Sequence, residues 1–340
     1  MQSIGVGVIG TGIMGTAHAR VVQEDPRVHL AGWVSRRPGA AELAEFGPVA
    51  VHDSVDALLQ DESVRIVIVA TPDFAHREPA VAAARAGRHV LIEKPLATSV
   101  ADAEAILTAV RASGVHAMTL FNQRWAPAYW QAKQELGAPG AGEPVMAYAR
   151  KNDTLSVPTE MISWADRSSP SWFLSSHDID LVTWFFEEPA TEVYATAVRR
   201  VLVARGIDTP DAVHAQVRFA GGAVATFESC WVVPNGYPTV VESFVEVLTT
   251  GQHLHIDRKV EQLEVATAER IRYPRTGGAR IAGRHVGPAA SAVRHFVDVV
   301  TGGEPPLIPL EHSVQVTRLL AAIEQSYTSG APVQLDGAAG

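Results

Sequence analysis

Strand-like and helix-like segments alternate through about the first 120 residues, and this alternation restricts the fold more than any other feature of the chain. Helical segments separate successive apolar, β-rich runs. Strands joined by helical crossovers pair in parallel, with helices on both faces of the sheet. The sequence therefore predicts an α/β domain with a doubly wound parallel sheet. The β-rich runs are residues 4–9, 28–35, 65–70, 90–92 and 115–122.

The pattern changes near residue 122. A Gly/Pro-rich segment at 137–144 precedes strand-like runs separated by short turns, and short turns join antiparallel strands. A helical segment at 171–186 interrupts these runs, and two helical segments close the chain at 288–301 and 311–329. We expect an α+β domain whose open, mainly antiparallel sheet carries helices on one face. The uncovered face predicts a homodimer or homotetramer through this sheet.

The expected division is therefore a dinucleotide-type domain at residues 1–122 and a substrate-binding and oligomerisation domain at residues 123–340. The formal net charge of −9 and a pI near 5.8 argue against a nucleic-acid or anionic-membrane partner. No segment approaches the roughly 18–20 uninterrupted apolar residues of a membrane span, and the start MQSIGVGVIG lacks the features of a signal peptide. We expect a cytoplasmic protein, and no Cys/His spacing suggests a metal site.

A glycine fingerprint, Gly10-Thr11-Gly12-Ile13-Met14-Gly15, directly follows the first strand and opens the first helix. In this context Gly10 allows the tight turn, Gly12 leaves room for a pyrophosphate, and Gly15 allows close packing of helix on sheet. The helix N-terminus supplies free N–H groups and positive potential. This pattern predicts a Rossmann domain that binds a dinucleotide; the alternative is a glycine-rich turn without a ligand.

The end of the second strand bears on the choice of dinucleotide. An NAD site usually has Asp or Glu there, but this chain has Ser35, Arg36 and Arg37. A hydroxyl and two guanidiniums suit a 2′-phosphate, because Arg binds phosphate through two parallel hydrogen bonds. The sequence favours NADP over NAD as cofactor, and the alternative is a solvated basic loop.

Three motifs together point to a family. The fingerprint at residues 10–15, TPDFAH at 71–76 and EKP at 93–95 occur in an order and spacing that resemble the Gfo/Idh/MocA oxidoreductases, named after glucose–fructose oxidoreductase and inositol dehydrogenase. The resemblance extends over essentially the whole chain. It implies that Thr71 and Pro72 line the nicotinamide pocket and that His76 lies nearby. The alternative for His76 is a helix-start residue that bonds the backbone, and His18 is interpreted as packing or capping.

Glu93 and Lys94 follow a buried strand, at the end of the sheet where such folds bind ligands. The resemblance implies that Lys94 hydrogen-bonds the hydroxyl being oxidised and stabilises developing negative charge on its oxygen. It also implies that Glu93 holds the lysine or the cofactor, and that the Lys94–Pro95 peptide is unusual, with cis as one form. The alternative is an ordinary surface Glu–Lys pair.

A proton acceptor is the second requirement of alcohol oxidation, and His177 is the candidate general acid/base. The family usually reads D-x-G-x-H-x-x-D here; His177 and Asp180 match the last two positions, while Phe173 and Ser175 replace the first two. Loss of the family aspartate is compatible with a changed substrate, with another acid in its place, or with no activity. The replacement acids are Asp166, Asp178 and Asp180, and the alternative for His177 is a purely structural histidine.

Arg124, Lys151 and Trp164 join Lys94, His177 and Asp180 as candidate substrate-binding residues, since hydroxyl-rich ligands need many polar groups and an aromatic face. The predicted function is hydride transfer between NADP or NAD and a sugar, glycoside or cyclitol. Rival substrates are an imine, an amino-sugar precursor, an aromatic-diol precursor or another non-sugar carbonyl. A rival outside enzymes is a dinucleotide-binding regulator of the same fold, because the resemblance extends to a yeast galactose-pathway repressor.

Overall fold

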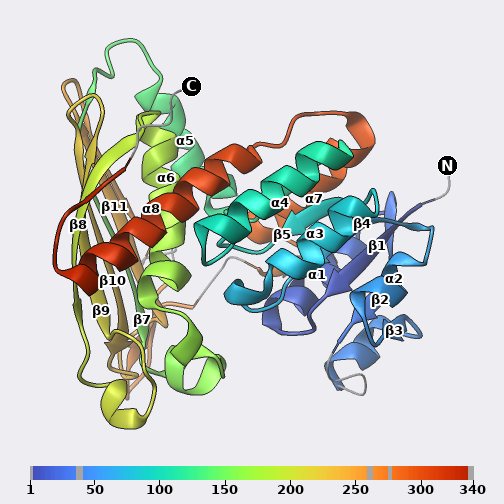
Figure 1. Ribbon diagram of the computed structural model, residues 1–340. Coiled ribbons are helices and arrows are strands. Elements are labelled where there is room, and N and C mark those ends of the chain that lie inside the picture. Colours follow the sequence, from blue (N-terminus) through green and yellow to red (C-terminus); the bar gives the residue numbers. More distant parts are fainter. Residues whose placement is uncertain (1–2, 36–40, 259–262, 275–277, 336–340) are drawn as a thin grey trace. The chain divides into compact units, whose positions relative to one another are not determined.

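The computed structural model describes residues 3–35, 41–258, 263–274 and 278–335 (Figure 1). The chain forms two compact units. Unit 1 comprises residues 1–125 and 277–317, and unit 2 comprises residues 126–276 and 318–340. The division expected from the sequence, at residues 122 and 123, assigned every later residue to one domain, whereas residues 277–317 group with unit 1 in the structure.

Unit 1 contains a six-stranded parallel sheet in the order β3-β2-β1-β4-β5-β6. The chain order reverses between β1 and β4, which is the arrangement of a doubly wound dinucleotide-binding fold, and this confirms the predicted class. Ligands of such sheets bind beyond the carboxyl ends of the strands near that reversal. The strands are β1 (Ile4–Ile9), β2 (Val28–Val34), β3 (Ala50–His52), β4 (Val64–Val69), β5 (His89–Ile92) and β6 (Ala117–Thr119).

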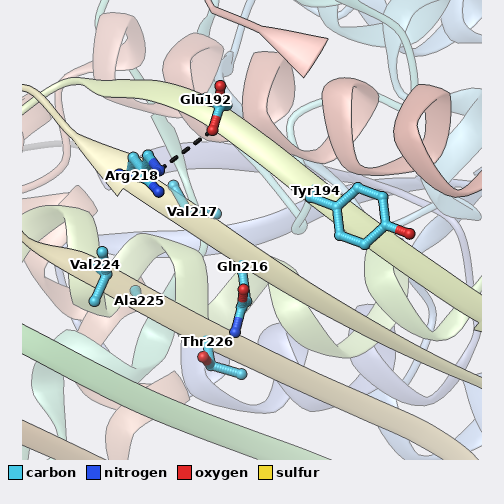
Figure 2. Close-up of a pocket in the computed structure, with 8 residues that line it drawn as sticks. All are labelled: Glu192, Tyr194, Gln216, Val217, Arg218, Val224, Ala225 and Thr226. Carbon is cyan, nitrogen blue, oxygen red and sulfur yellow. Dashed lines mark ion pairs between the residues drawn. The ribbon is translucent and has the colours of Figure 1, made fainter. Parts of the chain in front are cut away.

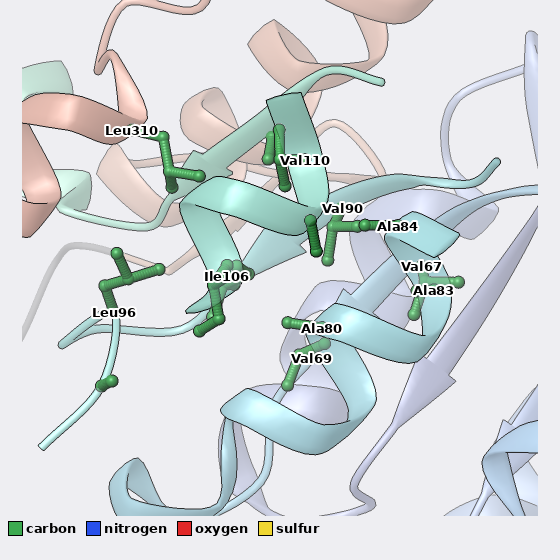
Figure 3. Packing of buried hydrophobic residues seen from close by; sticks show 14 of the residues in the cluster. Val67, Val69, Ala80, Ala83, Ala84, Val90, Leu96, Ile106, Val110 and Leu310 are labelled. Carbon is green, nitrogen blue, oxygen red and sulfur yellow. The ribbon is translucent and has the colours of Figure 1, made fainter. Parts of the chain in front are cut away.

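Helices α3 and α4 pack on this sheet through small and branched side chains (Figure 3). Strand β4 is buried along nearly its whole length, as a strand covered on both faces must be. The alanines of α3 allow the helix backbone to approach the valines of β4 and β5, and Leu310 and Val314 of α8 complete this core. The helices of unit 1 are α1 (Ile13–Gln23), α2 (Val55–Leu59), α3 (Arg77–Arg85), α4 (Val100–Ser113) and α7 (Pro288–Gly302), and it shares α8 (Leu310–Ser329) with unit 2.

Local sequence explains where α4 begins and ends. The Ser99 side chain accepts a hydrogen bond of 3.1 Å from the Asp102 N–H, which satisfies one of the free donors of the first turn. Gly114 ends the helix in the left-handed conformation, with φ at 64°, which glycine adopts without strain. Segments predicted from the sequence as helices at 99–114, 288–301 and 311–329 are confirmed within one or two residues.

Unit 2 contains a seven-stranded sheet in the order β12-β11-β7-β10-β9-β8-β17. Strands joined by short turns pair antiparallel, as predicted, but β7 lies between β10 and β11 and pairs in parallel with β10. Residues 155–223 separate these two strands in the chain, so no short-turn rule applies to their pairing. The strands are β7 (Pro144–Thr154), β8 (Ala190–Val198), β9 (Ala212–Phe219), β10 (Val224–Val233), β11 (Val241–Thr249), β12 (His253–Asp257) and β17 (Val333–Gln334).

One face of this sheet is covered by α5 (Pro127–Leu136), α6 (Ser176–Phe186) and the C-terminal part of α8 (Figure 1). The described residues leave the opposite face uncovered, since alternate residues of β9 and β10 are exposed or half-buried. A shallow hollow lies on that uncovered face, over β8, β9 and β10, with Glu192 and Arg218 paired across it at 3.3 Å (Figure 2). Two small hairpins complete the described strands: β13 (Val265–Ala266) with β14 (Ile271–Arg272), and β15 (Arg280–Ile281) with β16 (Arg284–His285).

Candidate active site

The fingerprint loop has the backbone that its glycines predict. Gly10 has φ at 102°, and a Cβ there would lie 2.4 Å from the Ala70 carbonyl oxygen. A Cβ on Gly15 would lie 2.0 Å from the Gly10 carbonyl oxygen, so the loop closes on itself only with glycine at both positions. A Cβ on Gly12 would meet nothing within 4 Å, so open space adjoins the loop where a pyrophosphate would approach.

The start of α1 suits an anion. Gly12 is the N-cap and has no side chain, so the N-cap residue itself takes up none of the free N–H groups of the first turn. Ile13 is 64% exposed, which is unusual for a branched apolar side chain, and Met14 is half-buried. The chain's own residues thus fit a dinucleotide: Gly10, Gly12 and Gly15 shape the loop, and the helix end offers donors.

Ser35 lies at the end of β2, where it is buried and its hydroxyl lies 2.8 Å from the Thr11 hydroxyl. This contact ties the fingerprint loop to the strand end at which a dinucleotide ribose is read. The two arginines predicted to hold a 2′-phosphate, Arg36 and Arg37, lie outside the residues that the structure describes.

The TPDFAH segment forms a short turn held from inside. Thr71 Oγ1 donates to the Ala75 carbonyl at 3.0 Å. The ring of His76 is buried, and its nitrogens lie 3.0 Å from the Thr71 carbonyl oxygen and 2.8 Å from the Pro95 carbonyl oxygen. His76 therefore joins the segment after β4 to the segment after β5. This is the alternative that the sequence left open, a histidine at a helix start that bonds the backbone. Thr71 and Pro72 remain half-buried at the carboxyl end of β4.

The end of β5 is fixed by a buried carboxylate. Glu93 Oε1 accepts a hydrogen bond of 2.6 Å from His18 Nε2 on α1, and Glu93 Oε2 accepts one of 3.1 Å from the Lys94 N–H. Burial alone would raise the pKa of Glu93, but these hydrogen bonds and the charges of His18 and Lys94 hold it below its ordinary value. The Lys94–Pro95 peptide is cis, and Lys94 is half-buried. Glu93 thus holds the backbone that carries Lys94, with His18 as its partner.

Arg124, predicted to bind substrate, is buried in unit 1. Its guanidinium donates to His312 Nε2 at 2.6 Å and lies 3.5 Å from the Leu307 carbonyl oxygen. These partners belong to the segment 277–317 of the same unit, so the structure shows Arg124 joining two stretches of chain. Its contact with a substrate stays a prediction.

His177 lies in the first turn of α6, directly after the π-helical turn η6 (Ser171–Ser175). The helix predicted at 171–186 is confirmed, but its first turn is wider than an α-helical turn, a feature frequent at functional sites. Asp180 is fully buried while His177 is half-buried. The two matched positions of the family motif therefore differ in their access to solvent.

Lys151 and Asp178 form a buried ion pair in unit 2. Lys151 Nζ lies 2.8 Å from Asp178 Oδ1 and 3.2 Å from the Ser243 hydroxyl, and the two charged side chains are 3% and 1% exposed. Burial raises the pKa of the Asp178 carboxyl and lowers that of the Lys151 amine, while each charge opposes the shift of the other. Lys151 thus anchors the residue next to His177, and its predicted substrate contact stays a prediction.

Phe173 occupies the place of the family aspartate, inside an aromatic cluster. Its ring meets Trp164 edge to face at 5.9 Å and Trp231 at 5.6 Å between ring centroids. Trp231 is fully buried, and the cluster is completed by Leu174, Ala165 and Leu202. Of the three acids considered as replacements, Asp166 is exposed and two, Asp178 and Asp180, are buried, and a replacement of the family aspartate by any of them stays a prediction.

Sequence reasoning missed the Lys151–Asp178 pair, although the strand pattern carries a signal for it. Ala147, Ala149 and Lys151 alternate along β7 on its buried face, so a lysine at that register implies a buried partner. Among the residues with described positions, no three His, Cys, Asp or Glu side chains gather as a metal ion would need. Within the same part of the chain, no helix is both long and apolar enough to cross a membrane.

Two family models match the chain in tandem. One, described as the oxidoreductase family with an NAD-binding Rossmann fold, matches residues 4–121. The other, described as the Gfo/Idh/MocA C-terminal domain, matches residues 129–255.

Relatives of this chain include two sugar or cyclitol dehydrogenases that match about two thirds of it. An inositol 2-dehydrogenase from Acidothermus cellulolyticus is 32% identical over 69% of this chain and 69% of its own length. A levoglucosan dehydrogenase from Pseudarthrobacter phenanthrenivorans is 28% identical over 67% of this chain and 68% of its own length. Among solved structures, GenD2 of gentamicin A biosynthesis, in complex with NAD, is 27% identical, with a TM-score of 0.84 over 99% of this chain and 97% of its own.

Proposed function

Because the chain belongs to the Gfo/Idh/MocA family of NAD(P)-dependent oxidoreductases, we propose that it transfers a hydride between the nicotinamide and a secondary alcohol or ketone of a sugar, glycoside or cyclitol. The observation that carries the proposal is the end of β5, where Glu93 and His18 hold the backbone of a half-buried lysine at the ligand-binding edge of the sheet. Relatives named for an inositol and for levoglucosan support the substrate class.

Lys94 and His177 have separate roles in this proposal. Lys94 donates a hydrogen bond to the substrate oxygen and stabilises its developing negative charge, and His177 accepts the hydroxyl proton. Bound NAD(P) supplies the nicotinamide ring that exchanges the hydride. Thr71 and Pro72 line the nicotinamide, while Gly10, Gly12 and Gly15 hold the pyrophosphate.

We also propose NADP as the preferred cofactor. Ser35, held by Thr11 at 2.8 Å, places a hydroxyl at the end of β2, where a carboxylate would repel a 2′-phosphate. The names of the relatives include both cofactors: one is a D-xylose 1-dehydrogenase (NADP⁺) and another a scyllo-inositol 2-dehydrogenase (NAD⁺). Equilibrium titration with both cofactors tests this preference, and Ser35→Asp reverses it if the proposal is right.

The activity test follows reduced nicotinamide by absorbance, with NADP⁺ or NAD⁺ and a panel of hexoses, glycosides and inositols. Lys94→Met and His177→Gln each lower kcat/KM by about 10²-fold or more, the usual worth of a positioned proton-transfer group. His29→Gln is the matched control, because the exposed His29 lies at the amino end of β2, where its ring is 2.9 Å from the Ser3 hydroxyl. If Lys94 and His177 serve one reaction, the double variant loses far less than the product of the two single losses.

A Lys94→Met variant with the kcat/KM of the wild type would contradict the proposed hydrogen bond from Lys94 to the substrate oxygen. Absence of turnover on the whole panel, with cofactor bound, would contradict the substrate class.

We further propose that the uncovered face of the unit 2 sheet binds a second copy of the chain. The face exposes apolar side chains on three strands, Met146, Tyr194 and Val224 among them, between charges that are already paired within the face. An apolar, self-paired face suits an isologous contact between identical chains. Sedimentation at micromolar concentration measures the mass, and a monomer there excludes the proposal.

A further inference from the structure

The start of the helix that carries His177 reaches solvent along one narrow strip. From Ser169 to Val182 every residue is buried except Phe173 and His177, which are half-buried. Four positions separate them, so the two side chains lie on one face of the helix, one turn apart. Whatever approaches the exposed edge of His177 along this strip also meets the ring of Phe173.

The surroundings of Phe173 fix its ring in place. Fully buried Trp231 lies behind it and half-buried Trp164 lies beside it, at 5.6 and 5.9 Å and in edge-to-face geometry on both sides. Such contacts favour one ring orientation, since the positive edge of one ring meets the negative face of the next. Phe173 and Trp164 therefore present a rigid apolar surface, which we call the aromatic wall.

We propose that the aromatic wall is a specificity determinant that selects substrates with an apolar group next to the reacting carbon: the C–H face of a pyranose ring, a deoxygenated carbon, or an alkyl or aryl aglycone. The inference rests on the proposed function, because it assigns the wall to the site of His177. A free hydroxyl facing the wall loses its water and gains no partner there, which costs affinity. An apolar group at the same place gains contact area with two aromatic rings.

The experiment compares one hexose with its deoxy analogue and with its methyl and phenyl glycosides. The wild type favours the apolar analogues by about 10-fold or more in kcat/KM, the usual range for an added apolar group in a pocket. Phe173→Asp and Trp164→Leu reduce that ratio to near one, and Phe173→Leu keeps most of it. Trp130→Leu is the matched control: Trp130 is an exposed tryptophan of the same unit that meets Trp184 instead of the wall, and its loss leaves the ratio unchanged.

Binding gives a second readout that needs no turnover. Tryptophan fluorescence changes when a phenyl glycoside binds the wild type, and the change is lost in Trp164→Leu and weakened in Phe173→Asp. The inference is overturned if kcat/KM for the hexose equals that for its apolar analogues, or if the wall variants leave the ratio of these values unchanged. The proposed function stands in both cases. If no compound is oxidised, the proposed function fails, and fluorescence titration alone decides whether the wall prefers the apolar ligands.

Discussion

Lys151 Nζ lies 2.8 Å from Asp178 Oδ1, and this ion pair connects β7 to the first turn of α6, one residue from His177. Desolvating two charges is expensive, and their attraction in a dry site offsets that cost only while both partners are present. The pair therefore makes the position of the helix start depend on a central strand of the sheet. It contributes more to the placement of His177 than to net stability.

Removing one partner of this pair should destabilise the protein strongly. Asp178→Ala leaves a buried ammonium without its counter-charge, and we expect a loss of about 3–5 kcal/mol in the free energy of unfolding. The double variant Lys151→Met/Asp178→Leu recovers most of that loss, because it removes both charges and keeps the volume. Urea denaturation measures both, with the exposed pair Arg199–Asp208 as control, whose side chains are 45% and 86% exposed. Equal losses in the single and double variants would count against this view.

Gly12→Ala and Gly15→Ala should separate binding from folding. A methyl group at Gly12 meets open space, so the variant melts like the wild type, yet it occupies the place of the pyrophosphate and weakens cofactor binding by about tenfold or more. A methyl group at Gly15 meets the Gly10 carbonyl at 2.0 Å, so this variant loses stability, by about 1–3 kcal/mol or more. Thermal melts without cofactor and cofactor titrations together test the pair. A Gly12→Ala variant with wild-type affinity would exclude this loop as the pyrophosphate site.

His18→Leu should damage the end of β5. It leaves the buried Glu93 carboxylate with one hydrogen bond fewer, so we expect the free energy of unfolding to fall by about 1–3 kcal/mol. We also expect a lower kcat, since Glu93 holds the backbone of Lys94. Arg20→Ala on the same helix is the control, because the Arg20–Glu45 pair is solvent-exposed and contributes less than about 1 kcal/mol. Unfolding curves and steady-state kinetics are both required. A stability loss with unchanged kcat would limit His18 to a structural role.

His89 should make the protein less stable in mild acid. Burial, with the nearby charges of His116 and Arg65, lowers its pKa from 6.5 to about 4, and its Nδ1 accepts a hydrogen bond of 3.0 Å from the His116 N–H. Between these two pKa values the unfolded chain binds more protons than the folded one. The contribution of neutral His89 to the free energy of unfolding is therefore complete above pH 6.5 and is lost as the pH falls toward 4. The slope is at most about 1.4 kcal/mol per pH unit, the value for one proton. Urea titrations across that range measure it.

His89→Gln flattens that slope, because the replacement does not titrate. The matched control is His29→Gln. This substitution also removes one titratable histidine, but at an exposed position of β2. A slope that is the same in His89→Gln and in the wild type would refute the assignment.

The sequence predicted the parts of the fold that depend on neighbours in the chain. Periodic runs and the positions of Ser99 and Gly114 located the helices, and the turns predicted the antiparallel pairs of the second sheet. The parallel pairing of β7 with β10 was not predictable in this way, because a long intervening segment leaves no local signal for it. The membership of residues 277–317 in unit 1 is likewise set by long-range packing.

The candidate site likewise contains residues whose roles follow from local sequence and residues whose positions depend on distant partners. The roles of Gly10 and Gly15 follow from backbone geometry that glycine alone allows, so the motif was informative. The burial of Arg124 and Lys151 follows from partners far away in the sequence, His312 and Asp178, which residue type does not reveal. The structure adds these buried partners to the two charged residues, and the contact of each with a substrate stays a prediction.

The discontinuity of unit 1 also affects how the chain is made. Helix α7 packs on α1 and on the turn η3 (Asn122–Trp125) through a face that includes Val293, Phe296 and Val297. A ribosome has to translate the whole of residues 126–276 before that helix emerges. Until then the nascent Rossmann segment exposes the apolar surface that α7 later covers, and we expect a fragment of residues 1–125 to aggregate.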